Sequence, residues 1–258
     1  MKIVTLNLWG GRLTKEILEF ISKYNGIVDV FCFQEVFNGA KVFFKSWDKN
    51  PKDGNPELLR DIQEVLTDNY HCVFDPVQGN EQGIATFVRE KYAVRGVRSD
   101  VIVNGRNTCV PGKHETIGRT ILSVELFHEG HVLWVSQFHG LWNGQGKDDC
   151  PERFRMIDAV RNHLRGLQGS RLGKENHQVL CGDFNLTPKT EAMTLLRVFP
   201  LVDHVRENGI KTTRTSHYER RETSPFADYI MTSPKLPVKS FEVLPDECSD
   251  HAALLLEI

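Results

Sequence analysis

Residues 177–185 read HQVLCGDFN, an apolar run that ends in a carboxylate and an amide. The apolar residues before Gly182 predict a buried strand. Asp183 has an ordinary explanation, because an Asp that follows Gly at a strand end is most often a turn or cap residue. The alternative is functional, since an unpaired buried carboxylate is costly unless a cation or hydrogen bonds hold it. Whether other strands end in the same way distinguishes the two.

Polar side chains recur at the ends of several predicted strands. Besides Asp183 and Asn185, they are Asn7, Glu35, Asp228 and Asp250. Four carboxylates at such positions suggest a bound metal, and oxygen donors without pairs of Cys or His favour Mg²⁺ or Mn²⁺ over zinc. His139 and His251 lie at the same kind of position. An imidazole beside carboxylates suits proton transfer or the binding of phosphate oxygens.

Taken singly, each of these residues also has a simpler interpretation. Glu35 could be a hydrogen-bonded glutamate at a sheet edge, and Asp228 could be a solvated residue before a tyrosine. His139 alone is more often a hydrogen-bonded core histidine than a catalyst. The functional interpretation therefore depends on finding these residues together and in order.

Strand patterns extend along the whole chain, with a few helices between them. Strands are expected at 2–8, 28–34, 70–75, 84–89, 93–103, 177–184, 226–233, 238–244 and 252–257, and two more within 117–138, joined by the turn at 128–130. Helices are expected after Thr14 and at 56–68, 150–167 and 189–198, with loops at 45–56 and 206–221. This order favours two packed sheets with helices outside, in a single domain that covers residues 1–258.

Composition narrows the possible classes. The 258 residues carry 32 Lys and Arg against 34 Asp and Glu, a formal charge of −2. This balance gives no global field for a polyanion, so any nucleic-acid contact must come from a local patch. No apolar run approaches the roughly 18 residues that cross a bilayer, and no signal-peptide pattern follows Met1. The six cysteines are scattered without CxxC spacing, which favours reduced thiols and a cytoplasmic protein.

Six short motifs occur in order along the chain. They are TLNLWG at 5–10, FQEV at 33–36, a His at 139 after an apolar strand, GDFN at 182–185, DYI at 228–230 and SDH at 249–251. The series resembles the endonuclease/exonuclease/phosphatase superfamily, also called DNase I-like, and spans Asn7 to His251. The resemblance implies an α+β fold, a four-layer α-β-β-α sandwich of two mostly antiparallel sheets, and divalent-metal hydrolysis of phosphoesters.

The resemblance also implies how the metal and the attacking water are held. Glu35 looks like the principal Mg²⁺ (or Mn²⁺) ligand, with Asn7 beside it and Asp250 on or near the metal site. Asp183 resembles the carboxylate that orients and deprotonates the attacking water. Asn185 would then hold the phosphate or that water.

The histidines would act on the charge that develops on the phosphate. By resemblance, His251 is oriented by Asp228 and binds non-bridging oxygens or transfers a proton, and His139 stabilises the same charge. Phosphoryl transfer mainly requires in-line positioning and neutralisation of the phosphoryl oxygens. An Asp paired with a His favours the imidazolium, so His251 could hold a proton near neutral pH. Arg119 has a position similar to that of a phosphate-contacting Arg in relatives, or is a surface cation of its strand.

The substrate is less clearly encoded. The motifs FQEVF and FADYI depart from the pattern of the abasic-site repair branch. Trp142 could stack on a base or anchor its own loop, and the loop at 206–221, with five Lys and Arg against two Glu, could hold a phosphodiester backbone or be solvated.

We therefore expect a Mg²⁺-dependent phosphodiester hydrolase, nuclease-like, that acts on nucleic acid or nucleotides without an obligate protein partner or a membrane span. The same-fold alternative is a phosphatase or a sphingomyelinase-like phospholipid diesterase. The alternative from another class is a catalytically silent binding scaffold.

Overall fold

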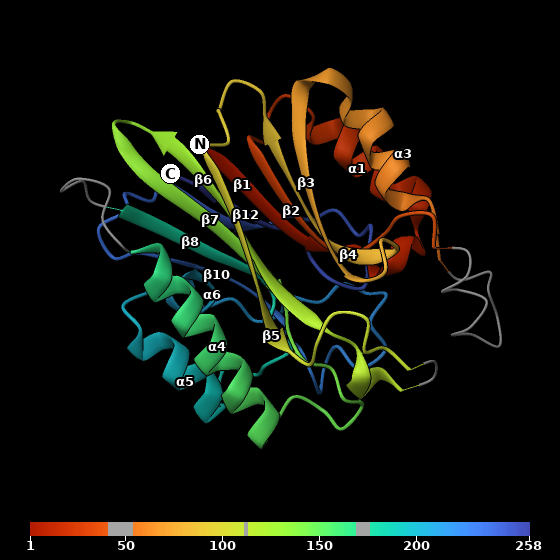
Figure 1. The fold of residues 1–258 in the computed structure, drawn as a ribbon, viewed down its shortest axis with the longest axis vertical. Helices are drawn as coiled ribbons and strands as arrows, with labels where there is room; N and C mark the ends of the chain where they lie inside the picture. Colours follow the sequence, from red (N-terminus) through yellow and green to blue (C-terminus); the bar gives the residue numbers. More distant parts are fainter. Residues whose placement is uncertain (41–53, 111–112, 169–175) are drawn as a thin grey trace.

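Two sheets packed face to face form the centre of the molecule (Figure 1). The computed structural model describes residues 1–40, 54–110, 113–168 and 176–258. Sheet A has the order β11-β12-β1-β2-β4-β3, and sheet B the order β5-β6-β7-β8-β10-β9. The strands of sheet A are β1 Lys2–Asn7, β2 Val30–Phe37, β3 Tyr70–Gln78, β4 Gln82–Arg89, β11 Ser240–Val243 and β12 Leu254–Glu257. Those of sheet B are β5 Gly96–Val103, β6 Arg119–His128, β7 His131–His139, β8 Asn176–Asp183, β9 Val202–Asp203 and β10 Asp228–Thr232.

Helices cover the outer face of each sheet. The pair α1 and α3 lies against sheet A, and the pair α4 and α5 lies against sheet B (Figure 1). The helix bounds are α1 Thr14–Tyr24, α3 Leu58–Leu66, α4 Pro151–Leu167, α5 Glu191–Val198 and the short α6 His204–Glu207, with single 3₁₀ turns η1 Trp9–Gly11, η2 Thr67–Asn69 and η3 His114–Thr116. The pairs β1–β2 and β7–β8 are parallel, and the other strand pairs are antiparallel. The predicted four-layer sandwich of mostly antiparallel sheets is therefore confirmed.

The sequence of β2 explains how one strand serves two layers. Successive side chains of a strand point to opposite faces of the sheet. Val30 and Cys32 belong to the apolar cluster that fills the space between the sheets and continues to α4 and α5, whereas Phe31 and Phe33 pack with residues of α1 and α3. Both faces are buried, so the strand reads as a continuous apolar run. The same run carries Glu35 to the edge of the sheet.

A pair of buried amides joins the two sheets directly below this edge. The Nε2 of Gln34 donates to the Oε1 of Gln137 at 2.8 Å, and the Nε2 of Gln137 donates to the carbonyl of Ala85 at 2.8 Å. Both glutamines are fully buried. The Nε2 groups of both glutamines and Oε1 of Gln137 have partners, whereas Oε1 of Gln34 has none among the described residues, and hydrogen bonds in a buried network favour one register of packing. Because Gln34 precedes Glu35 and Gln137 lies two residues before His139, this contact sets the spacing between the polar ends of β2 and β7.

Strand register brings several polar residues to one edge of the sandwich. Asp183 at the end of β8 is paired with His139 at the end of β7 and with Asp228 at the start of β10. In sheet A, Asn7 at the end of β1 pairs with Gln34 of β2. Parallel strands end together and an antiparallel neighbour starts there, so a single edge collects side chains from distant parts of the sequence.

Most of the predicted elements are present, with small differences at their ends. The turn at 128–130 is a two-residue hairpin loop, in which Glu129 and Gly130 both have positive φ and His128 pairs with His131. Strand β9 and helix α6 were not expected, since two and four residues are too short to show a period. Helix α6 takes the first two residues of the loop expected at 206–221. The loop expected at 45–56 lies mostly outside the described residues.

The structure also shows the state of the cysteines and the hydropathy of the helices. All six cysteines are free thiols, and Cys32 and Cys181 are buried as their apolar contexts suggest. Among the described residues, no helix is long and apolar enough to cross a membrane.

Candidate active site

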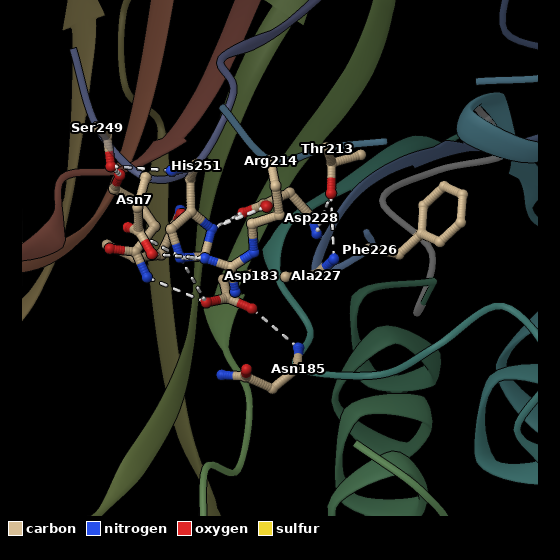
Figure 2. Close-up of polar contacts among 12 residues, drawn as sticks. Asn7, Asp183, Asn185, Thr213, Arg214, Phe226, Ala227, Asp228, Ser249 and His251 are labelled. Atoms are coloured by element: carbon tan, nitrogen blue, oxygen red, sulfur yellow. Dashed lines mark hydrogen bonds and ion pairs between the residues drawn. The ribbon is translucent and has the colours of Figure 1, made fainter. Parts of the chain in front are cut away.

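Carboxylates, imidazoles and guanidinium groups converge at the edge where β1, β2, β7, β8 and β10 meet (Figure 2). Asn7 lies at the centre of their sheet A side. Its Nδ2 donates to Glu35 Oε1 at 3.1 Å and to Asp183 Oδ2 at 3.0 Å. The N–H of Trp9 donates to Asn7 Oδ1 at 2.9 Å, which fixes the direction of the amide. Asn7 therefore links a carboxylate of sheet A to a carboxylate of sheet B.

Glu35 reaches this edge because its backbone is strained. The pairing of β2 with β4 shifts between Phe33 and Val36, and Glu35 has a φ of +56°, in the left-handed region that non-glycine residues rarely adopt. The bulge turns Glu35 toward the site. Burial raises the pKa of Glu35, and the charge of Asp183 adds to the effect, while Asn7 and Arg119 oppose it. Left-handed backbone at a non-glycine residue is typical of functional sites.

Asp183 is held at both oxygens. The N–H of Asn185 donates to Oδ1 at 2.9 Å, and Asn7 donates to Oδ2. Asn185 also has a positive φ, +51°, at the turn that follows β8. Oδ2 lies 3.6 Å from His139 Nε2 and 3.7 Å from His251 Nε2, so both histidines face the same carboxylate oxygen. The turn and cap interpretation of Asp183 accounts for Oδ1 but not for Oδ2.

His139 is paired with a buried arginine. Nη1 of Arg119 lies 3.2 Å from His139 Nδ1. A guanidinium only donates, so Nδ1 accepts and the ring proton is on Nε2, the nitrogen that faces Asp183. Burial, and then the charge of Arg119, lower the pKa of His139 well below its usual value. Arg119 itself is buried, so the interpretation as a surface cation of its strand is wrong.

His251 has the opposite proton arrangement. Its Nδ1 lies 2.8 and 2.9 Å from the two oxygens of Asp228, as expected for an orienting carboxylate. Its Nε2 lies 2.6 Å from Nη1 of Arg214, so Nε2 accepts and Nδ1 donates to Asp228. Burial, and then the charge of Arg214, lower the pKa of His251 to about 4, while burial raises the pKa of Asp228 to about 7. The interpretation that His251 could hold a proton near neutral pH is therefore wrong, because it considered Asp228 and not burial or Arg214.

Two hydroxyl groups hold the segments that carry Asp228 and His251. Thr213 Oγ1 accepts from the backbone N–H groups of Ala227 and Asp228 at 3.1 and 3.2 Å. Ser249 Oγ donates to the carbonyl of Asn7 at 2.7 Å and accepts from the N–H of His251 at 3.2 Å. The C-terminal motif is thereby fixed to the end of β1, 242 residues away in sequence.

The structure unites most of the predicted residues and adds one that was not singled out. The contacts described above connect the predicted residues Asn7, Glu35, Arg119, His139, Asp183, Asn185, Asp228 and His251. Asp250 joins them through Arg214, whose Nη1 donates to Asp250 Oδ2 at 2.8 Å. Trp142 is half-buried in the loop after β7, and none of these contacts involves it. Arg214 lies in the loop at 206–221, expected either to hold a phosphodiester backbone or to be solvated, and residues 213–215 of this loop are buried.

Divalent-metal chemistry requires carboxylate oxygens that are free to coordinate the ion, and the residues present fit it. Asp250 Oδ1 is buried and has no hydrogen-bond partner among the described residues. Burial raises the pKa of Asp250, with smaller contributions from the charges of Glu35 and Asp228, while His251 and Arg214 oppose the shift. Glu35 and Asp250 are therefore two buried carboxylates that a cation would stabilise. In the described part of the chain, three further groups could also bind a metal. Asp183, Asp228 and His251 each offer one ligand atom, and these three atoms lie within 4.8 Å of one another.

A small cavity of about 10 Å³ adjoins Glu35 on the side of β4 and β6. Its lining includes Glu35, Gln82, Arg119, Thr120 and His139. Gln82 Oε1, Arg119 Nε and Thr120 Oγ1 are buried there without partners among the described residues. A volume of this size holds about one water molecule, and the lining supplies polar partners for it.

Buried carboxylates, imidazoles and guanidinium groups at one edge of a two-sheet sandwich define a hydrolase-type centre for an anionic substrate. A family model then identifies the family, because residues 4–251 match the model described as the Endonuclease/Exonuclease/phosphatase family. The chain belongs to this family, and it is a hydrolase of phosphoric esters. The comparison with curated proteins gives no match.

Solved structures agree with the chain over nearly its full length. A mannosyl-6-phosphatase from Bacteroides thetaiotaomicron has a TM-score of 0.73 at 18% identity, covering 100% of this chain and 98% of the other. The human Nocturnin catalytic domain, with a bound sulfate anion, has a TM-score of 0.64 at 19% identity over 99% and 92%. ANGEL2, described as a 2′,3′-cyclic phosphatase, has a TM-score of 0.64 at 14% identity over 99% and 93%. At these identities the likeness establishes the fold alone.

Proposed function

We propose that the chain is a Mg²⁺-dependent phosphodiester hydrolase that acts on nucleic acid or nucleotides. The observation that carries the proposal is the environment of Asp183. One oxygen is fixed by the N–H of Asn185, and the other faces Asn7, His139 and His251. A carboxylate held in this way suits a general base whose position is set before the substrate arrives.

In this mechanism Asp183 orients the attacking water and accepts its proton. His139 presents the N–H of Nε2 toward Asp183 Oδ2, so it can donate to a phosphoryl oxygen bound beside that carboxylate. Arg119 keeps Nδ1 of His139 unprotonated and supplies the positive charge behind it. Asn185 would hold the water or the phosphate next to Asp183. These groups provide the positioning and charge neutralisation that phosphoryl transfer requires.

Glu35 and Asp250, with Asn7 beside them, would hold the metal. When bound, Mg²⁺ or Mn²⁺ would supply Lewis-acid polarisation of the phosphoryl oxygens. Asp228 fixes the ring of His251 through Nδ1, which leaves Nε2 directed at the same region as Asp183. The proposal treats residues 1–258 as one working domain, because both sheets contribute to the site.

A phosphatase acting on a phosphomonoester is the second candidate. It is supported by the mannosyl-6-phosphatase, which this chain matches over 98% of that protein's length. The choice between the two depends on the substrate and not on the catalytic groups, because the groups named above act on either ester.

Metal removal and re-addition test the proposal. We expect hydrolysis of bis-p-nitrophenyl phosphate to stop after treatment with EDTA and to return with Mg²⁺ or Mn²⁺. Glu35→Ala should need a higher metal concentration for the same rate or lose activity, because it removes the proposed principal ligand. Lack of activity on every phosphoester with either ion would contradict the proposal.

A substrate panel then separates the two candidates. It contains single-stranded DNA, duplex DNA with an abasic site, RNA, inositol phosphates, a sugar phosphate and sphingomyelin, each tested with the unmodified chain and Glu35→Ala. Cleavage of DNA or RNA that Glu35→Ala abolishes supports the diesterase. Cleavage of a phosphomonoester alone, with DNA and RNA untouched, would replace it with the phosphatase.

A further inference from the structure

Two buried cations beside the candidate active site have no part in the mechanism above. Arg214 lies in the loop between α6 and β10, and Lys147 lies in the loop between β7 and α4. Arg214 is 5% exposed and Lys147 is 4% exposed. Lysine and arginine are almost never fully buried unless they are paired. What each of them is paired with therefore indicates its role.

The two cations converge on one aromatic ring. The Cζ atom of Arg214 lies 4.0 Å from the centroid of the Tyr218 ring, and the Nζ atom of Lys147 lies 5.8 Å from the same centroid. Both distances are within the range of cation–π attraction. Tyr218 therefore holds two like charges close together, and Arg214 has a carboxylate partner in Asp250 at 2.8 Å.

Pairing with carboxylates explains only one of the two. Arg214 donates to Asp250 and His251, and its Nε has no partner among the described residues. Lys147 donates to the carbonyl of Phe226 at 2.6 Å, and within the described ranges no ion pair joins it to a carboxylate. An ammonium has three donors and a guanidinium five. Both cations thus keep donors that an incoming anion could use.

The charges around Lys147 place it on the site side of its loop. Burial, and then the charge of Arg214, lower the pKa of Lys147 to about 8, whereas Asp183, Asp228 and Asp250 oppose the shift. The same three carboxylates belong to the candidate active site. Arg214 is fixed to that site by a backbone bridge with His251, and Figure 2 shows its side chain beside the His251 ring, where Nη1 lies 2.6 Å from Nε2.

We propose that Arg214 and Lys147 form a phosphate-binding subsite, which engages the non-bridging oxygens of the substrate phosphate in the proposed reaction. The proposal rests on the proposed function, and it assigns to this cation pair the positive charge beside His251 Nε2, the atom that already accepts from Arg214. When the phosphate binds, the Arg214 guanidinium exchanges its hydrogen bond to His251 Nε2 for phosphate oxygens, which it can contact with two parallel N–H groups. Tyr218 keeps both cations at the entrance of the site.

Binding of inorganic phosphate, measured by calorimetry in the presence of Mg²⁺, tests the subsite without requiring turnover. We expect the Kd for phosphate to rise about tenfold or more in Lys147→Met and in Arg214→Ala, and less in Arg214→Lys, because lysine keeps the charge but not the paired donors. Arg220→Ala is the matched control, since Arg220 is an exposed arginine of the same loop. It should leave the Kd unchanged.

Kinetics on bis-p-nitrophenyl phosphate separate binding from positioning. The subsite predicts that KM rises with the phosphate Kd in each variant. A fall in kcat with KM and Kd unchanged would assign Arg214 a positioning role and overturn the proposal. If Arg214→Ala does not fold, Lys147→Met and Arg214→Lys carry the test, and an unchanged Kd in both overturns it.

The outcomes also separate this proposal from the proposed function. Turnover by the unmodified chain, with a phosphate Kd that is the same in all variants, would refute the subsite and leave the hydrolase intact. Phosphate binding that depends on Arg214 and Lys147 in a chain without turnover would support the subsite and contradict the proposed function. No phosphate binding by the unmodified chain at millimolar concentration would overturn the subsite.

Discussion

Replacing Asp228 with asparagine tests whether the Asp228–His251 pair acts in hydrolysis. The substitution keeps the size of the side chain, but it removes a buried negative charge whose oxygens lie 2.8 and 2.9 Å from His251 Nδ1. A hydrogen bond to a charged group contributes about 1.5–3 kcal/mol, so the loss should reduce kcat/KM by about 10- to 150-fold. The assay is hydrolysis of bis-p-nitrophenyl phosphate with saturating Mg²⁺ at pH 8, above the pKa of about 7 that burial gives Asp228.

The chain contains a matched control for this variant. Asp100 Oδ2 lies 2.6 Å from Nδ1 of the buried His163, away from the candidate site, so Asp100→Asn makes the same chemical change at a second Asp–His pair. We expect Asp100→Asn to lower the free energy of unfolding and to leave kcat/KM unchanged. If both variants reduce kcat/KM by the same factor, or if Asp228→Asn changes it by less than about threefold, the orienting role of Asp228 is refuted.

Three further predictions concern the structure that supports the site. Gln34→Leu leaves Gln137 Oε1 buried without its donor, so it should lower the free energy of unfolding by about 1–3 kcal/mol in urea titrations. The double variant Gln34→Leu with Gln137→Leu should lose less free energy of unfolding than the sum of the two single variants. Burial lowers the pKa of His163, so the unfolded chain binds a proton that the folded chain does not. Stability should therefore fall as pH drops through about 6.5, by up to about 1.4 kcal/mol per pH unit, and His163→Gln should flatten this dependence in urea titrations between pH 7.5 and 5.5. Gly182→Ala should reduce both stability and kcat, because Gly182 has a φ of +128° and a Cβ there would lie 2.1 Å from the Phe138 carbonyl oxygen. The control is Gly130→Ala, which should cost only backbone strain, since Gly130 has a φ of +86° and no atom would lie within 4 Å of its Cβ. Equal losses of stability in thermal unfolding would contradict this prediction.

The strand-end residues of the site could be predicted from the sequence because they combine two signals. An acidic or amide residue directly after an apolar run is unusual, and the six motifs occur in the order of a known family. Asp183 and Asp228 come together because strand register is strict, so that the end of one strand defines the position of its neighbour, and the packing of the two sheets brings Asn7 to Asp183. For these residues, local pattern and global fold agree.

Arg214 and Lys147 could not be predicted because burial in a loop has no periodic signal. The segment 206–221 contains five Lys and Arg that look equivalent in the sequence. Arg214 differs only through its backbone bridge to His251, 37 residues away, which the strand patterns do not encode. The same omission made the protonation of His251 wrong, because a pKa depends on every neighbour and on burial as well as on the nearest carboxylate.

The rate of hydrolysis by Asp183→Asn, compared with the unmodified chain at saturating Mg²⁺, tests the central claim most directly. Asparagine keeps the shape of Asp183 and can still accept from the N–H of Asn185, but it cannot take a proton from water. The proposed mechanism predicts that kcat falls by about 10²- to 10⁴-fold, with folding confirmed by an unchanged circular dichroism spectrum. A kcat within about tenfold of the unmodified value would contradict the assignment of Asp183 as the base.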